Sequence, residues 1–171
     1  MCSSDLWRVK CLRGDVCPSP VYAAGVLYVA NDSAVAAAIR DGGRGDVTDS
    51  HLLWTADIGL PDICSPLVSD QHLLLIASYG ALVCYDRNKG GEEPLWEESL
   101  DDSVLASPSL VGDTVYFIGE QGKGWVVRAG TAGLEPIAEN DLGEPCLSSP
   151  AFQPGRIYIR GKEHLFCIGE D

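Results

Sequence analysis

The stretch that decides the fold is Ser107-Pro108-Ser109-Leu110-Val111-Gly112-Asp113-Thr114-Val115-Tyr116, because its pattern occurs four times in this 171-residue sequence. The Ser-Pro dipeptide begins at positions 19, 65, 107 and 149, so successive copies are 46, 42 and 42 residues apart. The repeat prolines are Pro20, Pro66, Pro108 and Pro150. A regular period of this length indicates a chain built of repeated structural units.

Each repeat contains two apolar segments with the composition of β-strands. The first begins eight residues after the repeat serine, as Leu27-Tyr28-Val29, Leu73-Leu74-Leu75, Val115-Tyr116-Phe117 and Ile157-Tyr158-Ile159. The second follows a short turn, at residues 34–39, 81–85, 125–128 and 164–168. These segments are rich in β-branched and aromatic residues, and no amphipathic helical stretch of ten residues interrupts them. We therefore expect an all-β chain, a β-propeller of four-stranded antiparallel blades with about four blades in residues 7–171, preceded by the non-repeat residues 1–6.

A tryptophan precedes three of the four Ser-Pro dipeptides. Trp7 lies 12 residues before its serine, and Trp54 and Trp96 each lie 11 residues before theirs. In the fourth copy the same place falls near Ile137 and Ala138. A large ring at this position is expected to pack a blade junction rather than to bind a ligand.

Composition and charge limit the classes of partner. Hydrophobic residues make up 46% of the chain and charged residues 22%, as in a folded soluble protein. A formal net charge of −13 repels phosphate backbones, so nucleic acid is not an expected partner. The apolar runs, such as Leu73 to Ala77, are too short to span a bilayer, which takes about 20 residues.

The residues that could bind a metal form no strong motif. The seven cysteines contain no Cys-x-x-Cys, and Cys84 and Cys167 are expected to be small buried hydrophobic residues. Asp86, Asn88 and Glu97 imitate part of the ligand spacing of an EF-hand calcium loop. They are weak candidates, because Gly90 takes the fifth position and Pro94 the ninth, and turn chemistry already explains Asp86.

The repeat resembles a known family. The segment Leu82-Val83-Cys84-Tyr85-Asp86, followed by Gly90-Gly91, Leu95-Trp96 and the Ser107 to Tyr116 stretch, is similar to a pyrroloquinoline-quinone-like (PQQ-like) propeller repeat over about residues 7–168. That family includes quinone-dependent alcohol dehydrogenases and the outer-membrane assembly lipoprotein BamB. The resemblance implies that Trp54 and Trp96 dock against neighbouring blades, while Gly90 and Gly91 make the tight turn before the tryptophan.

Two functions follow as expectations from the resemblance. In the first, which we favour, the chain is a non-catalytic scaffold that binds partner proteins in the periplasm or cell envelope, as BamB-like proteins do. In the second, it is the carboxy-terminal part of a PQQ-dependent dehydrogenase or a small-molecule-binding sensor. The dehydrogenases typically hold calcium, an aspartate base and often a disulfide between adjacent cysteines. No Cys-Cys pair occurs here and no motif matches the other sites, so we predict no cofactor and no catalytic residue.

The ends of the chain raise the question of ring closure. The chain begins with a tryptophan strand around residues 6–9 and ends at residues 166–169 without one, so its first strand could complete its last blade. Closure could occur within a four-bladed ring, between two copies that form eight blades, or with blades upstream of Met1. The third arrangement is the one we favour, with native sequence missing before Met1.

Overall fold

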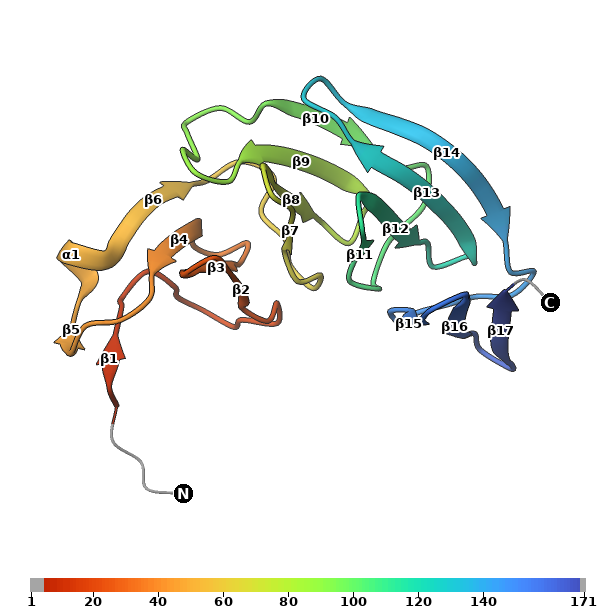
Figure 1. Ribbon diagram of the computed structural model, residues 1–171, viewed down its shortest axis with the longest axis horizontal. Coiled ribbons are helices and arrows are strands. Elements are labelled where there is room, and N and C mark those ends of the chain that lie inside the picture. The colour runs from red at the N-terminus through yellow and green to blue at the C-terminus, as the bar shows by residue number, and fades with distance from the viewer. Residues whose placement is uncertain (1–4, 170–171) are drawn as a thin grey trace.

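The computed structural model describes residues 5–169 as an open arc of four larger β-sheets and one two-stranded sheet (Figure 1). The non-repeat segment predicted for residues 1–6 lies mostly outside the described residues. A single four-residue helix, α1 (Thr48–His51), occurs among residues 5–169. None of the helical structure in this range is long and apolar enough to cross a membrane.

Each of the four larger sheets is one blade. Blade 1 contains β2 (Val21–Ala23), β3 (Val26–Ala30), β4 (Ala36–Arg40) and β6 (Leu52–Ala56). Blade 2 contains β7 (Leu67–Val68), β8 (His72–Ile76), β9 (Ala81–Asp86) and β10 (Trp96–Ser99). Blade 3 contains β11 (Ser109–Val111), β12 (Thr114–Ile118), β13 (Lys123–Ala129) and β14 (Leu134–Asp141). Blade 4 contains β15 (Ala151–Gln153), β16 (Arg156–Arg160) and β17 (Leu165–Gly169).

Within each blade, strands adjacent in sequence pair antiparallel. The strand after each Ser-Pro dipeptide lies on the inner side of the arc, and β6, β10 and β14 lie on the outer side (Figure 1). A separate two-stranded sheet pairs β1 (Trp7–Arg8) in parallel with β5 (Gly45–Asp46), which lies in the connection between β4 and β6. The prediction of an all-β chain with antiparallel blades is confirmed, with four strands in blades 1, 2 and 3 and three in blade 4 among residues 5–169.

The strands of Trp54 and Trp96 each complete the blade that precedes their Ser-Pro dipeptide. Trp54 lies on β6, the outermost strand of blade 1, and Trp96 lies on β10, the outermost strand of blade 2. In blade 3 this place is taken by β14, which contains Ile137 and Ala138. The sheet therefore starts at the Ser-Pro dipeptide and ends with the next tryptophan strand.

Apolar clusters fill the boundaries between blades. Blades 1 and 2 share the cluster of Tyr28, Ala30, Ala36, Ala38, Ala56, Leu73, Leu75, Val83 and Tyr85. Blades 2 and 3 share a larger cluster that includes Leu74, Ile76, Leu82, Cys84, Trp96, Val115, Phe117, Trp125 and Val127. Blades 3 and 4 share the smallest, with Ala106, Ile118, Cys146 and Ile159. Because burying one large aliphatic or aromatic side chain contributes about 1.5–3 kcal/mol, these boundaries hold the arc together.

Two sets of hydrogen bonds repeat across the boundaries. The indole Nε1 of Trp54 donates to the carbonyl oxygen of Arg87 at 3.1 Å, in the turn between β9 and β10. The indole of Trp96 donates to Gly130 at 2.9 Å, in the corresponding turn of blade 3. On the inner side, the backbone N–H of Ser19 donates to Ser65 Oγ, and that of Ser65 donates to Ser107 Oγ, each at 3.0 Å.

One prediction about the core is wrong. Cys84 is fully buried, but Cys167 is exposed although it occupies the corresponding place on β17. Phe166 packs on the cluster shared with blade 3, so its strand neighbour Cys167 points to the other side of blade 4, which no other blade covers among residues 5–169. The strand pattern correctly predicts on which side of the sheet Cys167 lies. Burial of this side chain also requires a following blade.

Candidate functional site

One carboxylate before each of blades 2, 3 and 4 binds the second hairpin of that blade. The Ser78 N–H donates to Asp62 Oδ1 at 2.8 Å, and the Ser78 hydroxyl donates to Oδ2. The Gln121 N–H donates to Asp102 Oδ2 at 3.0 Å. These contacts hold the segments that connect the blades against the hairpins. We call the surface formed by these connecting segments and hairpins the loop face. Its loops are therefore held in one arrangement.

Glu144 makes the most extensive of these contacts. Its Oε1 accepts hydrogen bonds from the backbone N–H groups of Glu163 at 3.1 Å and His164 at 2.9 Å. Its Oε2 lies 2.8 Å from Nδ1 of His164. The hydrogen bond from the His164 side chain is the main reason that the pKa of Glu144 lies below its usual value. The carboxylate is therefore ionised at neutral pH and holds the β16–β17 hairpin.

Asp62 shows a balance of opposing effects. Burial raises the pKa of its carboxyl, but hydrogen bonds from the Ser78 hydroxyl and backbone outweigh burial, so the pKa of Asp62 is lowered.

In blade 1 the second hairpin makes a different contact, because a side-chain amide donates to a backbone carbonyl group. Asn31, which is fully buried, donates from Nδ2 to the carbonyl oxygen of Arg13 at 2.9 Å.

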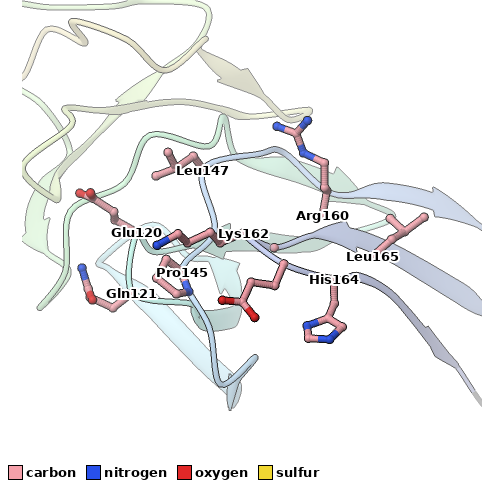
Figure 2. A pocket seen from close by; sticks show the side chains of 10 residues that line it. Glu120, Gln121, Pro145, Leu147, Arg160, Lys162, His164 and Leu165 are labelled. Atoms are coloured by element: carbon pink, nitrogen blue, oxygen red, sulfur yellow. The ribbon is translucent and has the colours of Figure 1, made fainter.

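A groove of about 660 Å³ opens on this face between blades 3 and 4 (Figure 2). Leu147, 56% exposed, lines this groove together with the charged side chains of Glu120 and Lys162. The remaining lining residues come from the β12–β13 hairpin, the connection between β14 and β15, and the β16–β17 hairpin: Gln121, Pro145, Arg160, Gly161, Glu163, His164 and Leu165. An exposed apolar side chain among charged ones can bind another polypeptide.

Glu144, Glu163 and His164 bring their ligand atoms within 4.8 Å of one another. Both oxygens of Glu144 already accept hydrogen bonds from the hairpin. Asp62 and Asp102 hold their hairpins in the same way without a histidine. We therefore assign Glu144 and His164 a structural role in this face.

The predicted calcium candidates lie in and beside the turn between β9 and β10. Asp86 Oδ1 accepts from the backbone N–H groups of Asn88 at 2.9 Å and Lys89 at 3.2 Å. Glu97 lies on β10, where its register partner is Val83. The observed contacts of Asp86 are those of a turn-forming aspartate. Calcium binding at these residues stays a prediction.

The predicted repeat residues lie at equivalent places in the blades. Each repeat proline directly precedes the first strand of a blade: Pro20 before β2, Pro66 before β7, Pro108 before β11 and Pro150 before β15. Proline at a strand start loses no ladder hydrogen bond. Gly90 and Gly91 both have positive φ, and Gly90 lies against the Trp54 ring. Trp7 lies on β1 and lines a cavity beside blade 1.

The contacts between these carboxylates and the hairpins were not predicted from the sequence. A signal was present, because Asp62 lies three residues before its repeat serine, and Asp102 and Glu144 each lie five before theirs. Their hairpin partners have no common residue type: serine, glutamine and histidine. The partners bind mainly through the backbone, which the sequence does not mark.

Comparison with solved structures places this arc among propellers. BamB from Moraxella catarrhalis is similar over 88% of this chain, with a TM-score of 0.67 and 16% identity. The computationally designed Ika8 protein is similar over 98% of this chain and 49% of its own, with a TM-score of 0.71 and 10% identity. A quinohemoprotein alcohol dehydrogenase from Pseudomonas putida is similar over 90% of this chain and 29% of its own, with a TM-score of 0.59 and 16% identity.

The chain spans 41% of the length of the Moraxella BamB. No curated protein matches it. The family described as outer membrane protein assembly factor BamB, a PQQ-type repeat family, matches residues 43–168. This match covers more than half of the sequence and three of its four Ser-Pro copies. The chain therefore belongs to the BamB-type family of PQQ-like propeller repeats.

Proposed function

We propose that this chain is a non-catalytic scaffold of the bacterial cell envelope that binds a partner polypeptide on its loop face. The observation that carries the proposal is the groove between blades 3 and 4, where Leu147 is exposed beside Glu120 and Lys162. Membership of the BamB-type family supports binding of protein rather than chemistry. Propellers present variable loops on a rigid framework, and binding sites concentrate on such loops.

The hydrogen bonds of Glu144 and Asp102 give this groove a rigid rim. Glu144 fixes the β16–β17 hairpin, and Asp102 fixes Gln121 in the β12–β13 hairpin. Both hairpins line the groove. A site whose loops are already ordered loses little conformational entropy when a partner binds.

The charge of blade 4 indicates which kind of partner segment would bind in the groove. Residues 149–169 contain the basic Arg156, Arg160 and Lys162 and only one acidic residue, Glu163, whereas the whole chain has a net charge of −13. Arg160 and Lys162 line the groove. The preferred ligand is therefore a short segment that places an apolar side chain on Leu147 and a carboxylate near Lys162.

The test is selection of peptides from a random library on the intact chain, followed by calorimetric Kd measurement. Recovered peptides should contain an apolar residue near an acidic one, and Lys162→Glu or Leu147→Ser should weaken binding at least tenfold. Lys89→Glu, on the turn between β9 and β10 of blade 2, is the matched control and should bind as the parent does. Equal binding by all variants would place the ligand elsewhere.

The same preparation tests the enzymatic alternative. On the scaffold proposal, titration with pyrroloquinoline quinone and calcium gives no saturable absorbance change and no alcohol-dependent dye reduction. A stoichiometric quinone spectrum would instead support the dehydrogenase or sensor function of the second expectation.

A further inference from the structure

Blades 2 and 3 border a pocket of about 370 Å³ on the face opposite the loop face. The β11–β12 hairpin of blade 3 lines this pocket, whereas the β12–β13 hairpin of the same blade lines the groove. Because these strands pair antiparallel, the two hairpins lie at opposite ends of the blade. The pocket lies in the middle of the arc, between two blades of four strands each (Figure 1). Its two main walls therefore belong to complete blades.

His72 is a buried polar residue that lines this pocket, with only 7% of its surface exposed. Leu74 and Ile76, two and four residues further along β8, belong to the core cluster shared with blade 3. His72 therefore points to the same blade boundary. Its hydrogen bonds within residues 5–169 are those of its backbone, to Ser69. The imidazole ring is thus a buried polar group that still lacks the partner such groups normally have.

Arg87 brings a positive charge to the same pocket. Its Nη1 donates to the carbonyl oxygen of Ser69 at 2.8 Å, and Ser69 Oγ accepts the backbone N–H of His72 at 3.0 Å. Both basic side chains are therefore attached to one turn. Nε of Arg87 is buried without a hydrogen-bond partner, and none of the ion pairs within residues 5–169 includes Arg87. A half-buried charge without a counter-charge is costly.

The repeat itself requires neither side chain. The place of His72, seven residues after the repeat serine, is taken in the other blades by Val26, Thr114 and Arg156. By strand register, the place of Arg87 is taken in blades 1 and 3 by Asp41 and Ala129. The blade fold therefore does not explain why blade 2 has two basic residues beside one pocket.

The other walls of the pocket are mainly apolar. Leu74 comes from blade 2, and Leu110 and Val115 come from blade 3. Asp113 also lines the pocket, but its Oδ2 lies 2.8 Å from Nε of Arg128, so this carboxylate already has a cationic partner. Apolar walls with a few polar groups, in a volume of about 300–1,000 Å³, are typical of sites for small molecules.

We propose that this pocket binds a small organic molecule with one carboxylate group on an apolar body. The planar guanidinium of Arg87 matches a carboxylate, and the imidazole of His72 offers a second N–H donor. The apolar body packs on Leu74 and Leu110. A doubly charged phosphate is disfavoured, because the carboxylates of Asp70 and Asp113 also line the pocket. This site goes beyond the scaffold function, since it shares no lining residue with the groove.

The first test is calorimetric titration of the intact chain with benzoate and with hexanoate, which join a carboxylate to an aromatic and an aliphatic body. At least one should bind at one site per chain with a Kd of about 1 mM or below, which a ligand of this size can reach. Benzamide, the uncharged analogue of benzoate, and inorganic phosphate should bind at least tenfold more weakly. No saturation by either carboxylate, or equally tight binding of benzamide or phosphate, would overturn the proposal.

Two substitutions test the basic side chains without disturbing the repeat. Arg87→Ala and His72→Thr introduce the residue types that blade 3 has at the same places. Arg87→Ala should weaken carboxylate binding at least tenfold, and His72→Thr about threefold, because a hydrogen bond to a charged donor is the stronger one. Arg40→Ala, at an exposed arginine of β4, removes the same charge outside the pocket and should bind as the parent does. An unchanged Kd for Arg87→Ala in a folded protein would contradict the site.

Backbone amide NMR locates the bound carboxylate. Benzoate or hexanoate, whichever binds more tightly, should shift the amide signals of residues 69–72 and 112–115, which line the pocket or lie in its two hairpins. The signals of residues 161–165, which line the groove, should stay in place. Shifts confined to residues 161–165 would assign the carboxylate to the groove and overturn a separate site.

Discussion

The indole ring of Trp54 lies directly on the α-carbon of Gly90, so that a methyl group on Gly90 would overlap the ring. Trp54 belongs to the outer strand of blade 1, and Gly90 belongs to a turn of blade 2. The same indole donates a hydrogen bond to Arg87 in this turn. The repeat thus couples blade 1 to blade 2 through one ring, one turn and one carbonyl group, and Trp96 makes the corresponding hydrogen bond from blade 2 to blade 3.

Gly90→Ala should lower the free energy of unfolding by more than the strain of its left-handed backbone alone would. Gly90 has φ +59°, and Gly112 has φ +64° with no atom within 4 Å of the place that an alanine methyl group would take. Gly112→Ala should therefore cost about 1–2 kcal/mol from the left-handed backbone alone. Gly90→Ala should cost about 1–3 kcal/mol more, because it overpacks the Trp54 ring. Urea denaturation of both variants measures the difference, and equal losses would refute the packing role.

Trp96→Phe should remove the hydrogen bond to Gly130 while keeping an aromatic ring at the boundary between blades 2 and 3. We expect a loss of about 1–2 kcal/mol in the free energy of unfolding, because the carbonyl oxygen loses its donor. Tyr22→Phe, on the exposed part of β2, is the control and should change little. A loss no larger than that of the control would show that the indole donor is dispensable.

The fold could be predicted from the sequence because four copies of Ser-Pro and its apolar triplet keep one register. Period-2 patterns also located the second strand of each blade. The exposure of Cys167 could not be predicted in this way, because it depends on what covers blade 4 rather than on the pleat of β17. The groove escaped prediction because its rim is held by backbone N–H groups, which every residue except proline has.

The Glu144 contact should make stability depend on pH. The pKa of Glu144 is lowered in the folded chain, so the contact stabilises the fold above the ordinary glutamate pKa of about 4.3. This stabilisation is lost as the pH falls through the lowered folded-state pKa. Thermal unfolding should therefore show a Tm gap between the parent and Glu144→Gln that is full at pH 7 and closes in strong acid.

Glu163→Gln is the control for this pH series, since Glu163 contributes only its backbone N–H to the Glu144 contact. It should keep the Tm of the parent at pH 7. A gap for Glu144→Gln that stays constant down to strong acid would mean that the carboxylate charge is not what holds the hairpin.

The exposed and buried cysteines should differ strongly in their reactivity towards an alkylating reagent. Burial raises the pKa of Cys64 and of Cys84 to about 12, so almost no thiolate forms at pH 8. Iodoacetamide should therefore label the exposed Cys17 and leave Cys64 and Cys84 unlabelled until urea is added. Peptide mass spectrometry identifies the labelled sites, and rapid native labelling of Cys84 would disprove the packing between blades 2 and 3.

The binding surface is best tested by amide hydrogen exchange of the chain with and without a library-selected peptide. We predict slower exchange in residues 144–148 and 161–165, which line or fix the groove, and no change in the turn of residues 86–91. Protection confined to residues 86–91, or saturating binding that leaves both groove segments unchanged, would contradict a polypeptide site between blades 3 and 4.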